Sequence, residues 1–533
     1  MKKLFKIFIL CASVFVVTSC ELDKQDSPNA LSPEQANVDF MLNGLQITFR
    51  DVVYNLQTRG QELTRMQNMF GSTYGNAYFP TTFNGPWTNA YANLLVDAKV
   101  LIPLAEEREL YHHAGIAQVL QAYTLVILVD NFGDVPYSEA LDATNFNPKV
   151  DDDEEIYAEA LAMLDRGIAN LKKTPLAVPK TDLYFGGDED NWISLAKTLK
   201  LKMYLQTRLV DDVASEIQAL INDGDLIFDA SQAFLFQYST TDQNPDSRHP
   251  DFSGNYVGGA SDYMSNYFMG VLYTEKAVED PRMRYYFYRQ STTTPTSPQI
   301  LPCINRSAPP HYPFGTTFCA VGNGYWGRDH LDDDGIPPDT ELRTIFGVYP
   351  AGGQYDADQG TLGQASSGLA GAGILPIYMH FFTDFMLAEA ALTIPGVGGN
   401  HRDLLENGIR ASIDYVMDFG ASIATTNIPS QATIDSYVAE VLSDYDAADN
   451  NGKLAIIIKE FYISAWGNGY EAYNSYRRTG YPTDLQPTLL PSPGDFYRSL
   501  IYPQAFVDRN NQVSQKPNHK VQVFWDPGTI SLD

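Results

Sequence analysis

The stretch that most constrains the fold is residues 116–140, IAQVLQAYTLVILVDNFGDVPYSEA. Apolar side chains recur in it with the spacing of one helix face: Ile116, Val119, Leu120, Tyr123 and Ile127. Other apolar residues fill the remaining faces, so the sequence predicts a helix that is buried on most sides. Gly133 can take the positive φ that closes a helix, and Pro136 cannot continue one. We expect a rigid polar corner after the helix, with Asp130 and Asp134 in structural and not catalytic roles.

The last twelve residues of this stretch, VDNFGDVPYSEA, resemble the (T/V)-D-x-F-G-D-V-P-Y-x-E-A signature of the SusD/RagB-like outer-membrane lipoproteins of Bacteroidetes. Further segments are similar to the same family. They are the W-x3-Y-x2-L pattern that begins at Trp87, the aromatic helix at 377–392 that contains A-E-A, and the C-terminal segments 459–482 and 496–511. Together these matches span most of the chain, and they are weakest across 226–375.

The helical patterns on both sides of residues 226–375 predict a mainly α fold. Apolar stripes with helical spacing run through 33–69, 86–108 and 191–210, and helices resume at Pro376. The family resemblance implies a tetratricopeptide-like scaffold of paired helices, although the sequence shows no clean consensus repeat. Residues 226–375 are rich in Gly, Pro, Ser, Thr, Asn and Asp. We therefore expect an irregular, loop-rich insertion there. The family resemblance implies that this insertion helps to build the ligand face.

The first twenty residues have the organisation of a lipoprotein signal. MKKLFK is basic, and an apolar segment too short to span a bilayer leads to small residues and Cys20. This end resembles a lipobox, with Val17 where leucine is usual, and the resemblance implies cleavage before Cys20 and acylation of its thiol. The alternative is an ordinary secretory signal with an incidental cysteine. The expected parts are a signal peptide at 1–19, a lipidated tether at 20–32 and a single helical domain at 33–533.

The charge of the chain disfavours binding to nucleic acid and to anionic lipid. It has 65 acidic residues against 36 lysines and arginines, which gives a formal net charge of −29. Nucleic acid is disfavoured because Lys and Arg must neutralise phosphates, and adsorption to anionic lipid by charge alone is disfavoured for the same reason. Since no other stretch is apolar for long enough to span a bilayer, the lipid on Cys20 is the expected membrane attachment.

Catalytic signatures are absent from the sequence. It contains no G-x-S-x-G, H-E-x-x-H, phosphate-binding loop or dinucleotide-binding fingerprint. His112 and His113 are adjacent, so they point to different sides of a helix and make a poor metal pair. We expect a binding protein rather than an enzyme, with no cofactor other than a structural calcium ion. A helical glycoside hydrolase is the alternative, because such an enzyme needs only two acids across the scissile bond.

The candidate ligand-binding residues are rings and polar side chains on two loop-rich stretches. Flat rings stack on sugar faces while Asn, Asp and Arg bond hydroxyl groups, and the resembling family uses an exposed arc of such rings. The candidates are Tyr74, Asn76, Tyr78, Phe79, Trp87, Tyr325, Trp326 and Arg328. Trp326 is the strongest of them, because Gly322, Gly324 and Gly327 predict an exposed loop. The alternative for each ring is a place in the core, above all for Trp87.

An acidic turn follows the second group of rings. Asp332, Asp334 and Asp339 offer hard oxygen ligands of the kind that Ca²⁺ takes, although their spacing is not that of an EF-hand. A bound calcium ion is one hypothesis for this turn. The other is an acidic turn that is capped by its own carboxylates.

Two cysteines remain after the signal, Cys303 and Cys319. An exported chain passes an oxidising compartment, so a disulfide between them is one expectation, and two buried free thiols are the other.

Charged residues in the C-terminal helices are expected to pair with each other. Glu389 lies in the apolar helix at 377–392, where a buried carboxylate needs a partner, and Arg410 or Arg477 is the expected one. Arg477, Arg478 and Arg498 are expected to anchor the C-terminal segment through bidentate ion pairs.

The resemblance also implies a function. A protein of this family would be lipid-anchored and exposed at the surface of the outer membrane. It would capture a nutrient oligosaccharide and deliver it to a partner SusC-like TonB-dependent transporter. Peptide capture is the first alternative, because relatives of the RagB type bind peptides. A hydrolase and a purely structural subunit of the transporter, which would bind no ligand, are the others.

Overall fold

The computed structural model describes residues 37–532, apart from residue 143 and the ranges 260–261 and 334–341. The predicted signal peptide, Cys20 and the tether lie outside the described residues. Two of the three acids predicted to bind calcium, Asp334 and Asp339, lie outside them as well.

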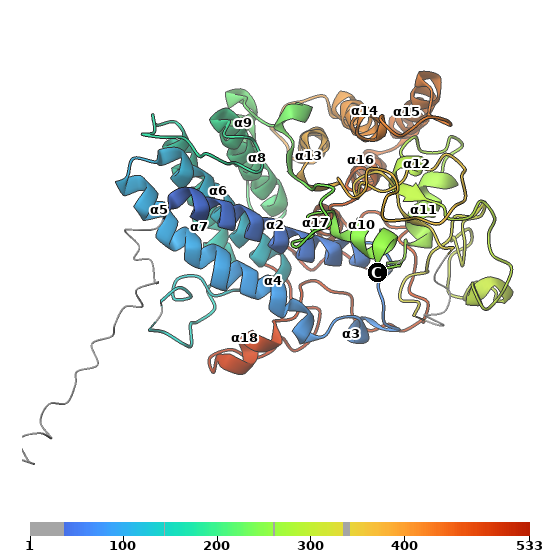
Figure 1. The fold of residues 1–533 in the computed structure, drawn as a ribbon, viewed down its shortest axis with the longest axis horizontal. Helices are drawn as coiled ribbons and strands as arrows, with labels where there is room; N and C mark the ends of the chain where they lie inside the picture. Colours follow the sequence, from blue (N-terminus) through green and yellow to red (C-terminus); the bar gives the residue numbers. More distant parts are fainter. Residues whose placement is uncertain (1–36, 143, 260–261, 334–341, 533) are drawn as a thin grey trace, which may run out of the picture.

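Two groups of long helices form the scaffold of the fold (Figure 1). The first group contains α2 (Val38–Leu63), α5 (Val96–Glu107), α6 (Tyr111–Phe132), α7 (Asp153–Leu171), α8 (Glu189–Thr207) and α9 (Ala214–Asp223). The second contains α13 (His380–Thr393), α14 (His401–Gly420), α15 (Gln431–Ala447), α16 (Asn450–Ser464) and α17 (Gly469–Thr479). Neighbouring helices in the chain pack on each other within each group, as α6 does on α7 and α13 on α14. The prediction of a mainly α, tetratricopeptide-like scaffold is confirmed.

Short elements connect the long helices. Between α2 and α5 lie α3 (Tyr74–Ala77), the 3-10 helix η2 (Pro80–Phe83), α4 (Asn84–Thr88) and the π-helix η3 (Asn89–Leu95). Within 226–375 lie η4 (Ala230–Gln232), α10 (Pro250–Phe252), η5 (Ser253–Val257), α11 (Asn266–Tyr273), α12 (Met283–Tyr286) and η6 (Pro302–Asn305). A last helix, α18 (Gln504–Arg509), follows α17. The longest helix in the described part of 226–375 has eight residues, so this region is as irregular as its composition predicts.

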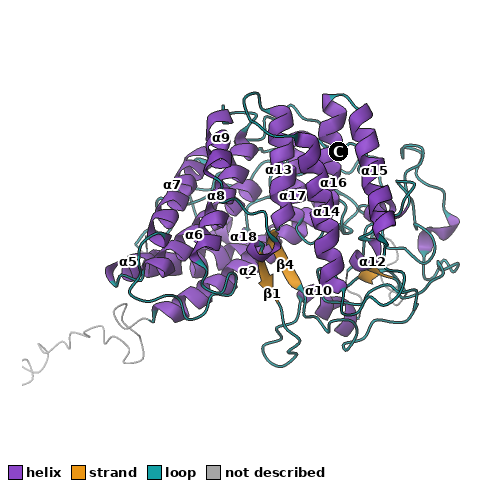
Figure 2. Cartoon of the chain, turned by 90° about the horizontal axis from the view of Figure 1, so that it is seen from above, coloured by secondary structure: helices purple, strands orange, loops and turns teal. Residues whose placement is uncertain are grey.

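In the described part of the chain, four short strands form two antiparallel pairs (Figure 2). Strand β1 (Phe234–Gln237) pairs with β4 (Ile374–Tyr378), and β2 (Phe287–Tyr288) pairs with β3 (Ile345–Phe346). The first pair brings the beginning and the end of the irregular region together, because its two strands come from opposite ends of that region. The loops between them are thereby held on the helical scaffold.

The helix α6 is the buried helix that the sequence predicts. Every residue of it except Tyr111 is buried, and it ends at Gly133, whose φ is +67°. In the part of the chain that the structure describes, α6 is the one helix that is long and apolar enough to cross a membrane, but it lies wholly inside the protein, as a core helix does. After the corner, Val135 forms an isolated antiparallel bridge with Asp151, at the start of the segment that leads into α7.

The carboxylate of Asp130, in the last turn of α6, is a meeting point for distant parts of the chain. It accepts hydrogen bonds from Tyr157 OH of α7 at 2.6 Å, from Asn474 Nδ2 of α17 at 2.7 Å and from Trp525 Nε1 at 2.9 Å. Tyr470 OH of α17 donates to it too. Because Asp130 is fully buried, its side chain holds α6, α7, α17 and the C-terminal segment together, in the structural role expected for it.

The first long helix of the chain, α2, packs against the last long helix, α17. A Cβ atom at Gly60 would lie 2.1 Å from the carbonyl oxygen of Gly469, and one at Gly469 would lie 2.0 Å from the backbone nitrogen of Gln61. Only glycine therefore permits the two backbones to approach this closely. The contact joins the first helix group to the second across more than 400 residues of sequence.

The predicted partners of Glu389 are wrong. Its carboxylate, 1 % exposed, receives two hydrogen bonds from Arg478 at 2.8 and 2.7 Å and one from Arg208 at 2.9 Å. Arg410 instead pairs with acids on the surface of α14 and α15. Arg477 bonds the backbone carbonyl of Asp130, so it anchors the corner rather than a carboxylate. Adjacent residues on a helix point about 100° apart, which is why Arg478 and not its neighbour faces α13.

Candidate binding site

Most of the predicted binding residues are buried. Six of the eight have less than a tenth of their surface exposed: Tyr74, Tyr78, Trp87, Tyr325, Trp326 and Arg328. Tyr74 and Tyr78 both pack on the ring of Tyr497, and Trp87 packs on Phe132. These rings fill the core beneath the loops, so they cannot offer a flat face to a sugar in this structure.

The expectation that Trp326 is exposed is wrong. Its side chain is fully buried, and its Nε1 donates to the carbonyl oxygen of Leu342 at 3.1 Å. The glycines around it were predicted to form an exposed loop, but they allow close packing instead. A Cβ atom at Gly324 would lie 2.0 Å from the carbonyl oxygen of Ser291, and one at Gly327 would lie 1.9 Å from that of Met264. They mark close packing of backbone on backbone, not an open loop.

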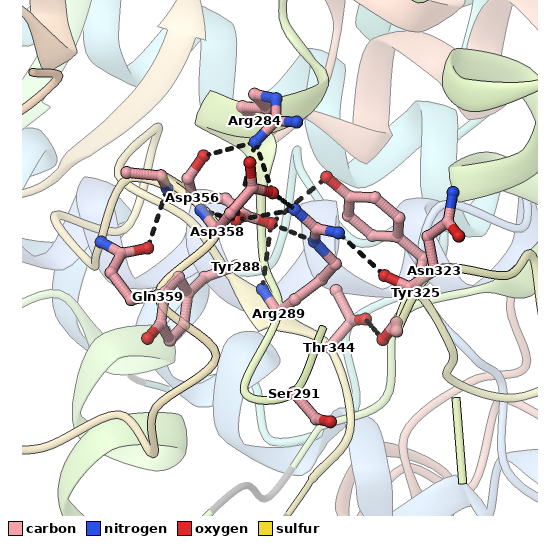
Figure 3. A network of polar contacts seen from close by, with 12 residues as sticks. Arg284, Tyr288, Arg289, Ser291, Asn323, Tyr325, Thr344, Asp356, Asp358 and Gln359 are labelled. Carbon is pink, nitrogen blue, oxygen red and sulfur yellow. Dashed lines mark hydrogen bonds and ion pairs between the residues drawn. The ribbon is translucent and has the colours of Figure 1, made fainter. Parts of the chain in front are cut away.

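Tyr325 belongs to a polar network that fixes the loops of the irregular region (Figure 3). The guanidinium of Arg289 lies over its ring, 4.5 Å from the centroid, and donates to Asp356 Oδ2 at 2.6 Å. Tyr325 OH donates to the same carboxylate oxygen at 3.2 Å. Burial and the nearby Asp356 raise the pKa of Tyr325 well above its ordinary value, so it stays a neutral donor. Arg284 Nη1 donates to Asp358 Oδ1 at 3.0 Å, so Asp358 also belongs to the network.

The remaining two candidates, Asn76 and Phe79, are exposed. Phe79 leaves 63 % of its surface open and precedes the short helix η2. Their part in ligand binding stays a prediction.

The described surface has a cleft of about 640 Å³. It lies between α11, the loop at 313–317 and the segment from Tyr476 to Pro487, and none of the eight predicted residues lines it. Hydroxyl and carboxylate groups line much of it: Thr274, Glu275, Thr316, Thr317, Thr483 and Asp484. A second hollow of about 650 Å³ shares Pro487 and Ser531 with it, so the concave surface continues along the C-terminal segment.

Phe314 gives this cleft an exposed aromatic ring. Its side chain is fully exposed, and it stands between Pro313 and Gly315 at the cleft wall. Phe314 is not among the eight residues predicted from the sequence. The available signal was the Pro-Phe-Gly sequence between the two cysteines, since proline and glycine favour a turn and turns lie on the surface.

The polar side of the cleft is held by Lys459 of α16. Its Nζ lies 3.0 Å from Glu275 Oε2, 2.9 Å from Asp484 Oδ2 and 3.0 Å from Tyr267 OH. Burial lowers the pKa of Lys459, but the two carboxylates outweigh burial and raise it above the ordinary value. The lysine thus stays charged, and its two ion pairs hold Glu275 and Asp484 at fixed positions in the wall of the cleft.

The loop that carries Phe314 is fastened at both ends. Cys303 and Cys319 form a disulfide, which is the oxidised one of the two expected states. At the cleft, Gly270 of α11 lets the loop lie close, because a Cβ atom there would be 2.5 Å from Thr317 Oγ1. The backbone nitrogen of Cys319 also donates to the buried Asp329 at 2.9 Å. The cleft wall is therefore held in position before any ligand arrives.

Replacing both Cys303 and Cys319 by serine is expected to lower the free energy of unfolding by about 3 kcal/mol, because the open chain regains the entropy that a loop of this length loses on closure. Urea unfolding of the variant and of the wild-type protein measures the difference. The reducing agent dithiothreitol should lower the stability of the wild-type protein and leave the variant unchanged. Equal stability of the wild-type protein and the variant in the absence of dithiothreitol would contradict the prediction.

The described acidic residues outside the cleft include one group that is close enough to share a metal ion. Of the predicted calcium ligands, Asp332 is described, and it is buried with its carboxylate 3.2 Å from Arg328 Nη1. Among the described residues, one trio of acids lies close enough to share an ion, Asp134, Asp152 and Asp153. These residues surround the start of α7, where Asp152 caps the helix and Asp153 accepts a hydrogen bond from the backbone of Phe524. The trio has these structural roles, and the calcium site of the acidic turn stays a prediction.

Comparisons with known proteins agree on one family. A family model described as "starch-binding associating with outer membrane" matches residues 28–298, and one described as "SusD and RagB outer membrane lipoprotein" matches residues 380–524. A SusD/RagB family protein from Bacteroides thetaiotaomicron is 18 % identical, with a TM-score of 0.67 over 93 % of this chain and 100 % of its own. A chitin-binding SusD homologue from Flavobacterium johnsoniae is 19 % identical, with a TM-score of 0.64 over 92 % of this chain and 99 % of its own. No curated protein matches the sequence.

Proposed function

This chain belongs to the SusD- and RagB-like family of outer-membrane lipoproteins, and we propose from that premise that it captures a nutrient oligosaccharide at the cell surface. In this proposal Cys20 carries the lipid that anchors the protein. The protein binds its ligand without chemical change and passes it to a SusC-like TonB-dependent transporter, which supplies the energy for import. The structural similarity to a chitin-binding protein supports a glycan over a peptide as the ligand.

The observation that carries the proposal is the pairing of Phe314 with the polar side of the cleft. The faces of a sugar ring are apolar C–H surfaces that stack on an aromatic ring, and its hydroxyl groups donate to carboxylates and hydroxyls. Phe314 offers the ring, and Glu275 and Asp484 offer the acceptors, all along one cleft. The volume of about 640 Å³ is within the range of small-molecule sites.

The first experiment is a thermal-shift screen of residues 21–533 against oligosaccharides and peptides, with and without calcium. A ligand that binds the folded state raises the melting temperature once its concentration exceeds the dissociation constant. A shift with one class of glycan supports the proposal and identifies the substrate class. A shift with peptides alone contradicts the glycan assignment, and release of a smaller sugar from a glycan would identify the protein as a hydrolase. A shift caused by calcium alone would support the ion predicted at Asp332, Asp334 and Asp339.

Phe314→Ala is expected to weaken binding of the glycan found in the screen by about tenfold, the size of effect seen when an aromatic anchor is truncated. Isothermal titration calorimetry measures the dissociation constant. Because Phe314 is exposed and packs on little, the melting temperature should stay close to that of the wild-type protein. The matched control is Phe146→Ala, which removes an 80 % exposed ring that does not line the cleft. Equal affinities of the two variants would place the ligand elsewhere.

A further inference from the structure

The cleft that holds Phe314 adjoins a second hollow of similar size. The two hollows have volumes of about 640 and 650 Å³, and Pro487 and Ser531 line both of them. The hollows therefore meet beside these two residues. The proposed function uses only the first hollow, where Phe314, Glu275 and Asp484 lie, and it gives the second hollow no ligand.

One loop forms part of the wall of both hollows. Residues 313–317 line the first hollow, and His311 lines the second. The disulfide between Cys303 and Cys319 closes this loop. Phe314 is three residues from His311 in the chain, and three residues span at most about 11 Å. A sugar chain that stacks on Phe314 therefore lies within a few sugar units of the second hollow.

Hydrogen bonds fix this loop to the segment where the two hollows meet. On one side of Pro487, the buried Gln486 donates from Nε2 to the carbonyl oxygen of Thr317 at 2.7 Å. On the other side, His311 Nε2 donates to the carbonyl oxygen of Thr488 at 2.9 Å. Because both bonds join the same loop to the same short segment, the separation of the hollows is set before a ligand arrives. Two sites at a fixed separation bind one chain more tightly than either site does alone.

The lysine and the arginine that line the two hollows are both paired with acids in the described structure. Arg498 and Lys520 lie in the second hollow. Arg498 Nη1 lies 2.7 Å from Asp526 Oδ1, and its Nη2 donates to the carbonyl oxygen of Ile530. Lys520 Nζ lies 2.8 Å from Asp495 Oδ1. An anionic group on a ligand would have to compete with these acids for either cation.

Acids outnumber lysines and arginines around the two hollows. Glu275 and Asp484 line the first hollow, and Asp495 lines the second. With the partners Lys459 and Asp526 included, there are four acids against three cations. The whole chain has a net charge of −29, so an anionic ligand would be repelled at long range as well. An uncharged chain of sugars meets no such repulsion.

We propose that the ligand is an uncharged oligosaccharide chain that occupies both hollows and crosses between them beside Pro487 and Ser531. This inference rests on the proposed function, because it takes the first hollow as the glycan site. One sugar stacks on Phe314, and the sugars that follow lie in the second hollow. Uncharged polar side chains there, Thr529 and Gln522, are available to bond hydroxyl groups. The site thereby selects chains that are long enough to reach both hollows.

The length of the ligand is the first test. Isothermal titration calorimetry of residues 21–533 measures the dissociation constants of maltose-, cellulose-, xylan- and chitin-derived oligosaccharides, each from disaccharide to octasaccharide. In the series that binds, we expect the dissociation constant to fall by about tenfold or more once the chain reaches the second hollow, and then to level off. Oligogalacturonates and sulfated oligosaccharides are the anionic comparison. A tighter ligand among them contradicts the assignment of an uncharged chain.

A chemical label in the second hollow is the second test. Thr529 is exposed and lines the second hollow but not the first. Because Cys303 and Cys319 are bridged, Thr529→Cys supplies the single free thiol of residues 21–533. Reaction with N-cyclohexylmaleimide should weaken binding of long chains by about tenfold, to the affinity of short ones, and leave short chains unchanged. The matched control is labelled Thr425→Cys, an exposed position between α14 and α15 that lines neither hollow, and it should bind as the wild-type protein does.

The outcomes separate this inference from the proposed function. Equal affinities for short and long chains contradict the inference alone, since the first hollow would then hold the whole ligand. A label at position 529 that has no effect contradicts it in the same way. A label that weakens short and long chains equally contradicts it too, because the ligand would then lie in the second hollow. Binding of no oligosaccharide at all contradicts the proposed function itself, and with it this inference.

Discussion

Asp130→Ala is expected to destabilise the protein by about 4 kcal/mol or more, the largest effect of any single substitution in the family signature. The buried carboxylate accepts hydrogen bonds from four side chains: Tyr157, Tyr470, Asn474 and Trp525. Alanine leaves these donors buried and without an acceptor, and each such group costs about 1–3 kcal/mol. Since the donors belong to α7, α17 and the C-terminal segment, the loss loosens contacts between both helix groups. Urea unfolding followed by circular dichroism measures the change.

The signature supplies its own control for this experiment. Asp134 lies four residues further on, but its side chain is exposed and accepts one hydrogen bond, from the backbone of Asp153 at 3.2 Å. Asp134→Ala should therefore cost about 1 kcal/mol or less. If the two variants lose similar amounts of unfolding free energy, the four hydrogen bonds to the Asp130 carboxylate are not the reason for the structural importance of the signature.

The sequence was sufficient to predict the parts of the fold that depend on local pattern. The buried helix at 116–132 and its end at Gly133 followed from apolar spacing and from one glycine and one proline. The irregular region at 226–375 followed from composition. These features are local, because a helix period or a cluster of turn residues has the same meaning whatever it packs against.

The binding site could not be predicted in the same way, because exposure depends on distant parts of the chain. Trp326 and Phe314 both stand beside glycines, yet the first is fully buried and the second fully exposed. The difference is set by partners that sequence spacing does not reveal: the backbone of Met264 covers the loop of Trp326, while the disulfide holds the loop of Phe314 at the cleft. A glycine-rich ring motif is thus consistent with both environments.

Glu389→Gln is the second substitution with a large expected effect, about 3–5 kcal/mol of destabilisation. The glutamine has the same shape as the glutamate, so the change removes a charge without leaving a cavity. Arg478 of α17 and Arg208 next to α8 would then lose the carboxylate with which both of them pair. Thermal and urea unfolding measure the loss, and Glu406→Gln is the matched control. Glu406 pairs with Arg410 on the surface of α14, where an exposed pair contributes about 0.5 kcal/mol.

The pH dependence of stability gives a second, independent measurement of the interaction of Glu389 with Arg478 and Arg208. Burial alone would raise the pKa of Glu389, but Arg478 and Arg208 outweigh it and hold the pKa below the ordinary value. A carboxyl group whose pKa is lower in the folded state adds stability above its unfolded pKa, and that stability is lost as the pH falls through the folded value. The difference in unfolding free energy between the wild-type protein and Glu389→Gln should therefore be full at pH 7 and shrink once the pH drops below about 4. A difference that does not change with pH would show that the glutamine disturbs packing rather than charge, and that the arginines do not depend on the carboxylate between them.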